Sequence, residues 1–349
     1  MPLTPRAAER LGREAAVQKF EPAARALTCD WGIDPDRPLH PEQVRRWAEA
    51  MGAALARRRA AEVSACERGE WPAAPANPPE LLVLGVDGGR WQGREKDAQT
   101  GSRWREQKTL AASSYLPGDG RDPEQGGVGP AKLVTTHVAT ARPAGPFGRL
   151  ARVEAERRGL RQAKVVIGMG DGGNWIDPLF EREFRGCLNA RVIDWCHADE
   201  HLWDCAKAAH GAGTPQAAQL GERLEALLWD GRVADVVEAL RAESRRLGGP
   251  REGDPREHPR RVLAGNVEYF TRHGLDASHM DYPAFRKRGW PIASGDTEAA
   301  VKQFNKRVKG SEQFWTEDGV EAVLALRSLW ISQDGRWDRH WANRHAYVN

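Results

Sequence analysis

Short apolar runs, typical of buried strands, recur through the middle of the chain. In chain order they lie at 81–86, near 107–116, near 132–141, at 164–170 and at 190–193. Apolar residues recur at helical spacing over 147–160 and 175–184, and the segment 118–129, rich in Gly, Asp and Pro, predicts a loop. Strands that alternate with helices in this way predict an α/β fold, with a mixed sheet flanked by helices.

Helical periodicity dominates both sides of this strand region. Residues 199–289 contain no strand-like run and indicate an all-helical insertion, with a Pro- and Gly-rich break at 248–259. We therefore expect a helical N-terminal region that ends in a proline-rich linker, a strand-rich core, the insertion, and a C-terminal part that completes the core. These four parts span 1–79, 80–198, 199–289 and 290–349.

The N-terminal region predicts helices on both sides of a turn-rich break at 30–38. His40-Pro41 marks the start of the second helix, because Pro is favoured at the first helical position. The buried stripe of this helix consists of Val44, Trp47, Met51 and Leu55. Since Arg57–Arg59 make its far end basic, the pair fits a DNA-binding helix-turn-helix, and it fits a packing or dimerisation element equally well.

The composition argues against a membrane-spanning or disulfide-rich protein but does not by itself indicate a partner. The 349 residues carry a formal net charge of +3, and basic clusters such as 157–161, 286–288 and 302–309 could follow a phosphate backbone or simply be solvated faces. No apolar stretch approaches the roughly 20 residues of a membrane span. The five cysteines are scattered without a C-x-x-C pair, which suits a reducing compartment, and we expect a cytoplasmic protein.

Two of the predicted strands end in Asp-Gly-Gly, at Asp87 and at Asp171. Glycine permits a sharp turn and a close approach of a ligand. A carboxylate at the end of a buried parallel strand lies where α/β sheets usually bind ligands. A pair of such carboxylates is what a hard divalent cation requires, although each Asp could instead cap its own turn.

A third acid, Glu298, lies in the first turn of a predicted helix that starts at Ser294 or Asp296. The face of Glu298 also carries Lys302, Asn305 and Lys309. With Lys306 and Arg307, these lysines predict a DNA-binding surface beside a metal site. The alternative is an ordinary helix in which Glu298 pairs with Lys302.

Asp194 follows the last predicted strand and is followed by His197 and His201. The two histidines are one helical turn apart, so they could bind a metal together. We prefer a structural role for Asp194 and His197, with hydrogen bonds to each other or to backbone near the site.

Several segments resemble the IS-Kra family of bacterial insertion-sequence transposases. The similarity runs in order from about Leu81 to about Trp341. It rests on Asp171-Gly172-Gly173-Asn174-Trp175-Ile176, Val192–His197 with Glu200-His201-Leu202, Pro291–Gly295 with Glu298, Lys309-Gly310-Ser311, Trp315, Gly319, Ala322–Arg327 and Gly335–Asp338 with Trp341.

This resemblance implies an RNase H-like core with the helical insertion between the second and third catalytic acids. It also implies that Asp194-x-x-His197 corresponds to the C/D-x-x-H signature shared with Mutator-like transposases, which is not itself catalytic. Asp171 is therefore our second acid, with Asp194 as the competing choice. Relatives often carry a longer N-terminal region for reading the ends of the element.

The resemblance and the three acids together predict a DDE transposase. Asp87, Asp171 and Glu298 would hold two Mg²⁺ ions, for which Mn²⁺ can substitute, while a homodimer or larger assembly holds two DNA ends and target DNA. The alternatives are a shortened transposase-derived protein that binds DNA without cutting it, an RNase H-like nuclease, and a zinc hydrolase built on His197 and His201.

Overall fold

The computed structural model describes residues 3–98, 100–121, 126–310 and 312–345. Ser311 of the Lys309-Gly310-Ser311 segment and the last residues of the part 290–349 lie outside the described residues. None of the described helices is long and apolar enough to cross a bilayer.

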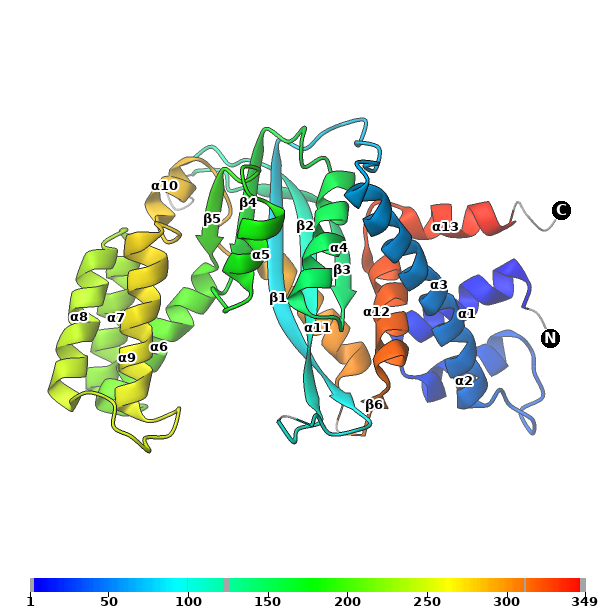
Figure 1. The fold of residues 1–349 in the computed structure, drawn as a ribbon, viewed down its shortest axis with the longest axis horizontal. Helices are drawn as coiled ribbons and strands as arrows, with labels where there is room; N and C mark the ends of the chain where they lie inside the picture. The colour runs from blue at the N-terminus through cyan, green and yellow to red at the C-terminus, as the bar shows by residue number, and fades with distance from the viewer. Residues whose placement is uncertain (1–2, 99, 122–125, 311, 346–349) are drawn as a thin grey trace.

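A mixed sheet forms the centre of the molecule (Figure 1). Its strands are β1 (Leu81–Gly93), β2 (Trp104–Leu116), β3 (Ala131–Thr140), β4 (Val165–Gly170) and β5 (Ala190–Ile193), in the spatial order β3-β2-β1-β4-β5. The first three strands form an antiparallel meander, and β4 and β5 continue the sheet in parallel with β1. A short β6 (Phe314–Trp315) pairs with the end of β1. The predicted α/β class and RNase H-like mixed sheet are confirmed.

The end of the first strand differs from the prediction. The sheet continues past Asp87, because β2 pairs with β1 as far as Gln92. Gly88 and Gly89 are therefore extended residues rather than a turn. Their lack of a side chain admits close neighbours, since a Cβ on Gly89 would lie 2.8 Å from Oδ1 of Asn305. The prediction that these glycines allow a close approach is confirmed, whereas the prediction that the strand ends at Asp87 is wrong.

Helices cover the two faces of the sheet separately. On one face, α4 (Ala144–Arg157) and α5 (Ile176–Glu183) pack on inward residues of the central strands. On the other face, α11 (Gly295–Val308) and α12 (Glu317–Ile331) pack around Trp91 and Ala111. Alternate residues of β1 point to opposite faces, so Leu82 and Leu84 contact the α4 layer while Gly85 and Asp87 lie on the α11 side.

The predicted helical insertion is present and lies beyond β5, at the left of Figure 1. It comprises α6 (Trp195–His210), α7 (Pro215–Trp229), α8 (Val233–Leu247), α9 (Pro259–Phe270), a π-helical turn η2 (Thr271–Asp276) and α10 (Tyr282–Lys287). Its helices share one apolar core with residues of β1, β4 and β5. The first helix starts directly after Asp194, so the insertion is a continuation of the sheet's last strand.

The N-terminal helices α1 (Pro5–Val17), α2 (Phe20–Asp30) and α3 (Pro41–Glu67) lie at the opposite end of the molecule (Figure 1). The predicted start of α3 is confirmed, with His40 in a capping box, and Val44 and Leu55 are buried. Residues 31–40 separate α2 from α3, which is longer than the turn of about 3–4 residues in a helix-turn-helix. These helices share a core with α12 and α13 (Arg336–His345), which favours the packing element.

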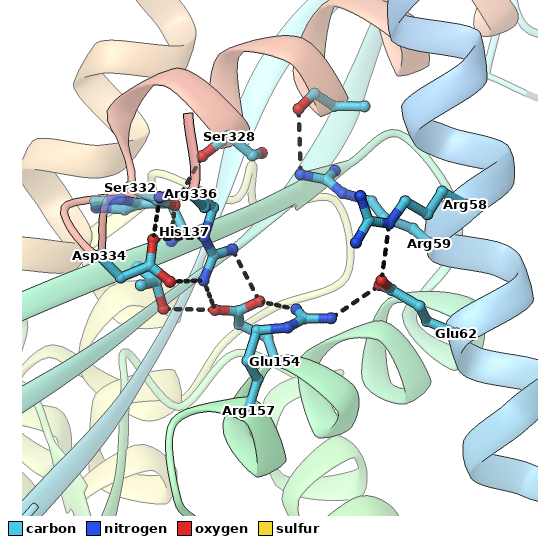
Figure 2. Close-up of polar contacts among 12 residues, drawn as sticks. Arg58, Arg59, Glu62, His137, Glu154, Arg157, Ser328, Ser332, Asp334 and Arg336 are labelled. Atoms are coloured by element: carbon cyan, nitrogen blue, oxygen red, sulfur yellow. Dashed lines mark hydrogen bonds and ion pairs between the residues drawn. The ribbon is translucent and has the colours of Figure 1, made fainter. Parts of the chain in front are cut away.

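A buried ion-pair network joins α3, α4 and the start of α13 (Figure 2). Glu154 is 1% exposed and receives hydrogen bonds from both terminal nitrogens of Arg336, at 2.6 and 3.1 Å. Arg157 and the hydroxyl of Thr136 also donate to its carboxylate, at 2.7 and 2.6 Å. Arg157 then reaches Glu62 on α3 at 2.8 Å. Segments far apart in the chain are thus held together by charge as well as by apolar contact.

The close crossing of α3 and α12 requires a glycine at Gly52. A Cβ at this position would collide with the backbone of Ala322, so Gly52→Ala should lower the free energy of unfolding by about 1–3 kcal/mol through overpacking. Gly265→Ala, in α9, is the matched control because no atom lies within 4 Å of its Cβ position. It should stabilise the helix by about 0.5–1 kcal/mol. Urea denaturation measures both, and equal effects would contradict the close crossing.

Candidate functional site

Asp87 lies on β1 beneath α11. Gly85 and Gly89 lie two residues before and after it. A Cβ at either position would collide with that helix, at Thr297 and at Asn305 respectively. Asn305 also accepts a hydrogen bond from the N–H of Arg90 at 3.1 Å. The helix is therefore seated directly on the strand, and the partly buried Asp87 lies on the same side of β1 as this helix.

Other acids surround Asp87. Burial raises the pKa of Asp87 to about 6, and the negative charges of Asp171 and Asp194 act in the same direction. A hydrogen bond from the N–H of Gly88 and the nearby His197 oppose this shift. A carboxylate held among like charges is the arrangement that a divalent cation relieves.

Asp171 lies in the loop after β4, as the sequence predicts. Its Oδ1 accepts a hydrogen bond from the N–H of Gly173 at 2.8 Å, and Gly172 has a φ of +81°, which suits glycine. The hydroxyl of Tyr269 in α9 donates to the backbone carbonyl of Asp171 at 3.0 Å. The helical insertion therefore helps to hold this loop in place.

Asp194 has a structural position. It is 3% exposed and caps α6, with Oδ1 accepting from the N–H of Cys196 at 2.7 Å. Its other oxygen accepts from both the N–H and the hydroxyl of Ser294, the residue that precedes α11. Since both carboxylate oxygens are engaged, Asp194 joins the start of α6 to the start of α11.

A second anchor holds the first turn of α11 on the sheet. The carboxylate of Asp296 accepts hydrogen bonds from Ser113 at 3.0 Å, Tyr115 at 2.6 Å and Lys132 at 2.5 Å. Ser294 and Asp296 are therefore both fixed by residues of the sheet region. The helix that carries Glu298 has a defined position as a result.

The side chain of Glu298 is 55% exposed and pairs with Lys302 at 2.6 Å. It lies close enough to α6 for its charge to raise the pKa of Cys196, after the larger effects of burial and of Asp194. Among the described residues, Asp87, Asp171 and Glu298 do not bring one oxygen each within 4.8 Å of one another. Two ions about 3.5–4 Å apart do not require that, because the outer carboxylates then lie on opposite sides of the pair.

The predicted DNA-binding residues divide into two groups. Lys302, Lys306 and Lys309 are exposed along α11. Arg307 is 0% exposed, donates to the carbonyl of Ala15 at 2.7 Å and lies over the ring of Phe20. The prediction that Arg307 contacts DNA is therefore wrong. Its helical position puts it on the buried stripe of Phe304 and Val308, beneath the N-terminal helices.

The histidine pair of α6 does not form a metal cluster with nearby acids among the described residues. His201 stacks on Tyr269 with ring centroids 4.4 Å apart, and burial lowers its pKa. His197 is 3.5 Å from Glu200 and lies near Asp87. A different group, Asp177 with His273 and His279, has the spacing of a metal site, and no motif in the sequence marks it.

A groove of about 970 Å³ adjoins Asp171 and runs between α6 and α9. Its lining includes the basic side chains Lys207, Arg256, Arg261 and Arg272, interspersed with acids such as Asp204 and Glu268. This open groove, with a mixed polar and apolar lining, joins the surface of the insertion to the loop of Asp171.

The chain matches no protein-family model, no curated protein and no solved structure.

Asp194→Ala is expected to lower the free energy of unfolding by about 2–4 kcal/mol. The change removes a helix cap, worth about 1 kcal/mol, and buried charge-assisted bonds to Ser294, worth about 1.5–3 kcal/mol. Thr214→Ala, which removes the capping bond of α7 and the contacts of the same hydroxyl with the carbonyls of His210 and Gly211, is the matched control and should cost about 1 kcal/mol. Equal losses in urea denaturation would show that Asp194 does not join α6 to α11.

Proposed function

We propose that this chain is a DDE-type DNA transposase that cleaves the ends of an insertion sequence and joins them to target DNA. The observation that carries the proposal is the position of Asp87, which is partly buried on the central strand of an RNase H-like sheet, with the charges of Asp171 and Asp194 nearby. The places of the three acids support the same reading, since Asp87 lies on a strand, Asp171 in the loop after a strand and Glu298 on the firmly anchored α11.

In this proposal Asp87, Asp171 and Glu298 would together hold two Mg²⁺ ions. Bound ions would supply an activated water or 3′-hydroxyl and stabilisation of the leaving oxygen. Asp87 and Asp171 are held by the sheet and its loop, so they need little rearrangement. Glu298 is exposed, and its carboxylate would leave the ion pair with Lys302 to bind a metal ion. Mn²⁺ would substitute, because it also accepts carboxylate ligands.

Asp194 is a positioning residue in this scheme. Both its oxygens already accept hydrogen bonds, so ligation of a metal would break the link between α6 and α11. This supports Asp171 as the second acid. Lys302, Lys306 and Lys309 would lie along the DNA backbone, and cleavage of two ends would require a dimer or larger assembly in the bacterial cytoplasm, associated with the nucleoid.

The test uses the DNA that flanks the coding sequence, as a labelled duplex, with a supercoiled plasmid as target and Mg²⁺ or Mn²⁺. The proposal expects metal-dependent cleavage that leaves a 3′-hydroxyl, followed by joining to the plasmid. Cleavage without joining would replace it with a nuclease on the same core. Binding without cleavage would replace it with a transposase-derived DNA-binding protein.

A further inference from the structure

A second cluster of metal-ligand side chains lies away from Asp87, where the insertion meets the sheet region. It consists of Asp177 on α5, His273 in η2 and His279 in the loop after it. One ligand atom from each lies within 4.8 Å of the other two, and Nδ1 of His273 is 3.6 Å from Oδ2 of Asp177. Ligands about 2.1 Å from a tetrahedral ion lie roughly 3.4 Å apart, so this spacing fits a single ion.

The Nδ1 atoms of both histidines have no hydrogen-bond partner among the described residues. His273 is 0% exposed, and its Nδ1 is buried without a partner. Nδ1 of His279 is likewise shielded and unpaired. Buried polar atoms are nearly always satisfied, so two such atoms in residues that cluster with a carboxylate need an explanation. A bound cation would satisfy all three groups at once.

The electrostatic surroundings fit neutral imidazole ligands. Burial lowers the pKa of both histidines, to about 4 for His279, so both are neutral near pH 7 and available to a metal. Arg191 pairs with the other oxygen of Asp177 at 2.9 Å, as an outer partner that orients a ligand carboxylate. Arg272 donates to Nε2 of His273. A metal on Nδ1 would leave the imidazole proton on Nε2, and the exposed side chain of Arg272 can then turn away.

We propose that Asp177, His273 and His279 bind one Zn²⁺ ion that fixes the helical insertion to the loop of Asp171. Two imidazoles and one carboxylate are a borderline donor set that suits Zn²⁺ better than Mg²⁺. A water molecule would complete the tetrahedron. The inference does not depend on the transposase activity.

The position of the site explains what such an ion would do. A Cβ on Gly172 would lie 2.8 Å from Nε2 of His273, so η2 rests against the turn that follows Asp171. The carbonyl of His279 accepts from the N–H of Ile193 at 3.0 Å, one residue before Asp194. The ion would therefore hold together α5, η2 and the end of β5. Its loss would loosen the loop of Asp171 without removing a carboxylate.

The test is metal analysis of the purified full chain, with Zn²⁺ and Co²⁺ as probes. We expect one zinc per chain in the wild type and a visible tetrahedral Co²⁺ spectrum after exchange. Asp177→Asn and His279→Gln should weaken Zn²⁺ binding more than about 100-fold, because loss of outer partners alone costs 10–100-fold. His210→Gln, on α6 outside the cluster, is the matched control and should keep the zinc.

His279→Cys supplies a further readout that a folding defect cannot mimic. A thiolate is also a zinc ligand, so this variant should retain the ion and add a sulfur-to-cobalt charge-transfer band. The proposal is overturned if the wild type holds no zinc and added Zn²⁺ does not raise its Tm. It is also overturned if His279→Cys binds Co²⁺ without that band. Mg²⁺-dependent cleavage is scored separately, so the two proposals fail independently.

Discussion

Asp87→Asn is expected to abolish metal-dependent DNA cleavage, with a loss of at least about 10³-fold, because the ion clamp contributes several kcal/mol to the transition state. The same substitution should stabilise the metal-free protein at neutral pH. The pKa of Asp87 in the folded protein, about 6, lies above the ordinary 3.8. Ionisation of Asp87 therefore lowers the free energy of unfolding as the pH rises above 3.8, and the loss is complete above pH 6. Asparagine removes that cost, which we put at about 1–2 kcal/mol after screening by solvent.

Glu298→Gln is the matched control for Asp87→Asn. Cleavage should again be lost, but stability should change by less than about 0.5 kcal/mol, because Glu298 is exposed and makes a surface ion pair. Cleavage assays and urea denaturation at pH 7.5 without metal distinguish the two variants. An Asp87→Asn protein that is no more stable than the wild type would contradict the crowded carboxylate site.

Glu154→Ala is expected to cost about 3–5 kcal/mol of folding free energy, the largest stability effect that we predict. It leaves the guanidinium of Arg336 with Asp334 alone inside the protein and deprives Arg157 of a second partner. Glu62→Ala is the control, because Glu62 is the more exposed partner of Arg157 and its loss should cost less than about 1 kcal/mol. Equal losses in the two variants would show that the network is not a buried unit.

The same network predicts sensitivity to acid. Burial opposes ionisation of Glu154, but the two arginines outweigh it and lower the pKa of Glu154 to about 2, from an ordinary 4.5. Its stabilising effect is therefore complete above pH 4.5 and is lost as the pH falls towards 2. His137 acts at higher pH, because burial lowers its pKa to about 4 and protonation between 6.5 and 4 favours the unfolded chain. In thermal denaturation, the fall in Tm below pH 4.5 should be smaller for Glu154→Ala than for the wild type.

Local pattern predicted most of the fold, because its elements are short and their apolar periodicity is unambiguous. The strand at 190–193 and the helix start at Pro41 match the structure. The end of β1 was misplaced because pairing with β2, a contact distant in sequence, overrides the turn preference of Gly88-Gly89. Arg307 was misread for a related reason. Its burial depends on Ala15 and Phe20, which only the folded chain brings to it.

The candidate site divides in the same way. A strand or helix position was enough to single out Asp87, Asp171 and Glu298, but nothing local shows that Asp194 reaches Ser294, because one hundred residues separate the two. Asp177, His273 and His279 likewise have no motif spacing and meet only through the π-helical turn after α9. The apolar pattern predicts helices and strands, but it does not predict which side chains of an insertion meet those of the core.

Anomalous diffraction from crystals soaked in Mn²⁺ would show whether Asp87, Asp171 and Glu298 hold a pair of ions, since Mn²⁺ scatters anomalously and accepts the ligands of Mg²⁺. We expect Mn²⁺ bonded to Asp87, with one ion shared with Asp171 and the other with Glu298. Crystals in which Mn²⁺ avoids Asp87, or in which Asp194 leaves Ser294 to become the second ligand, would contradict it.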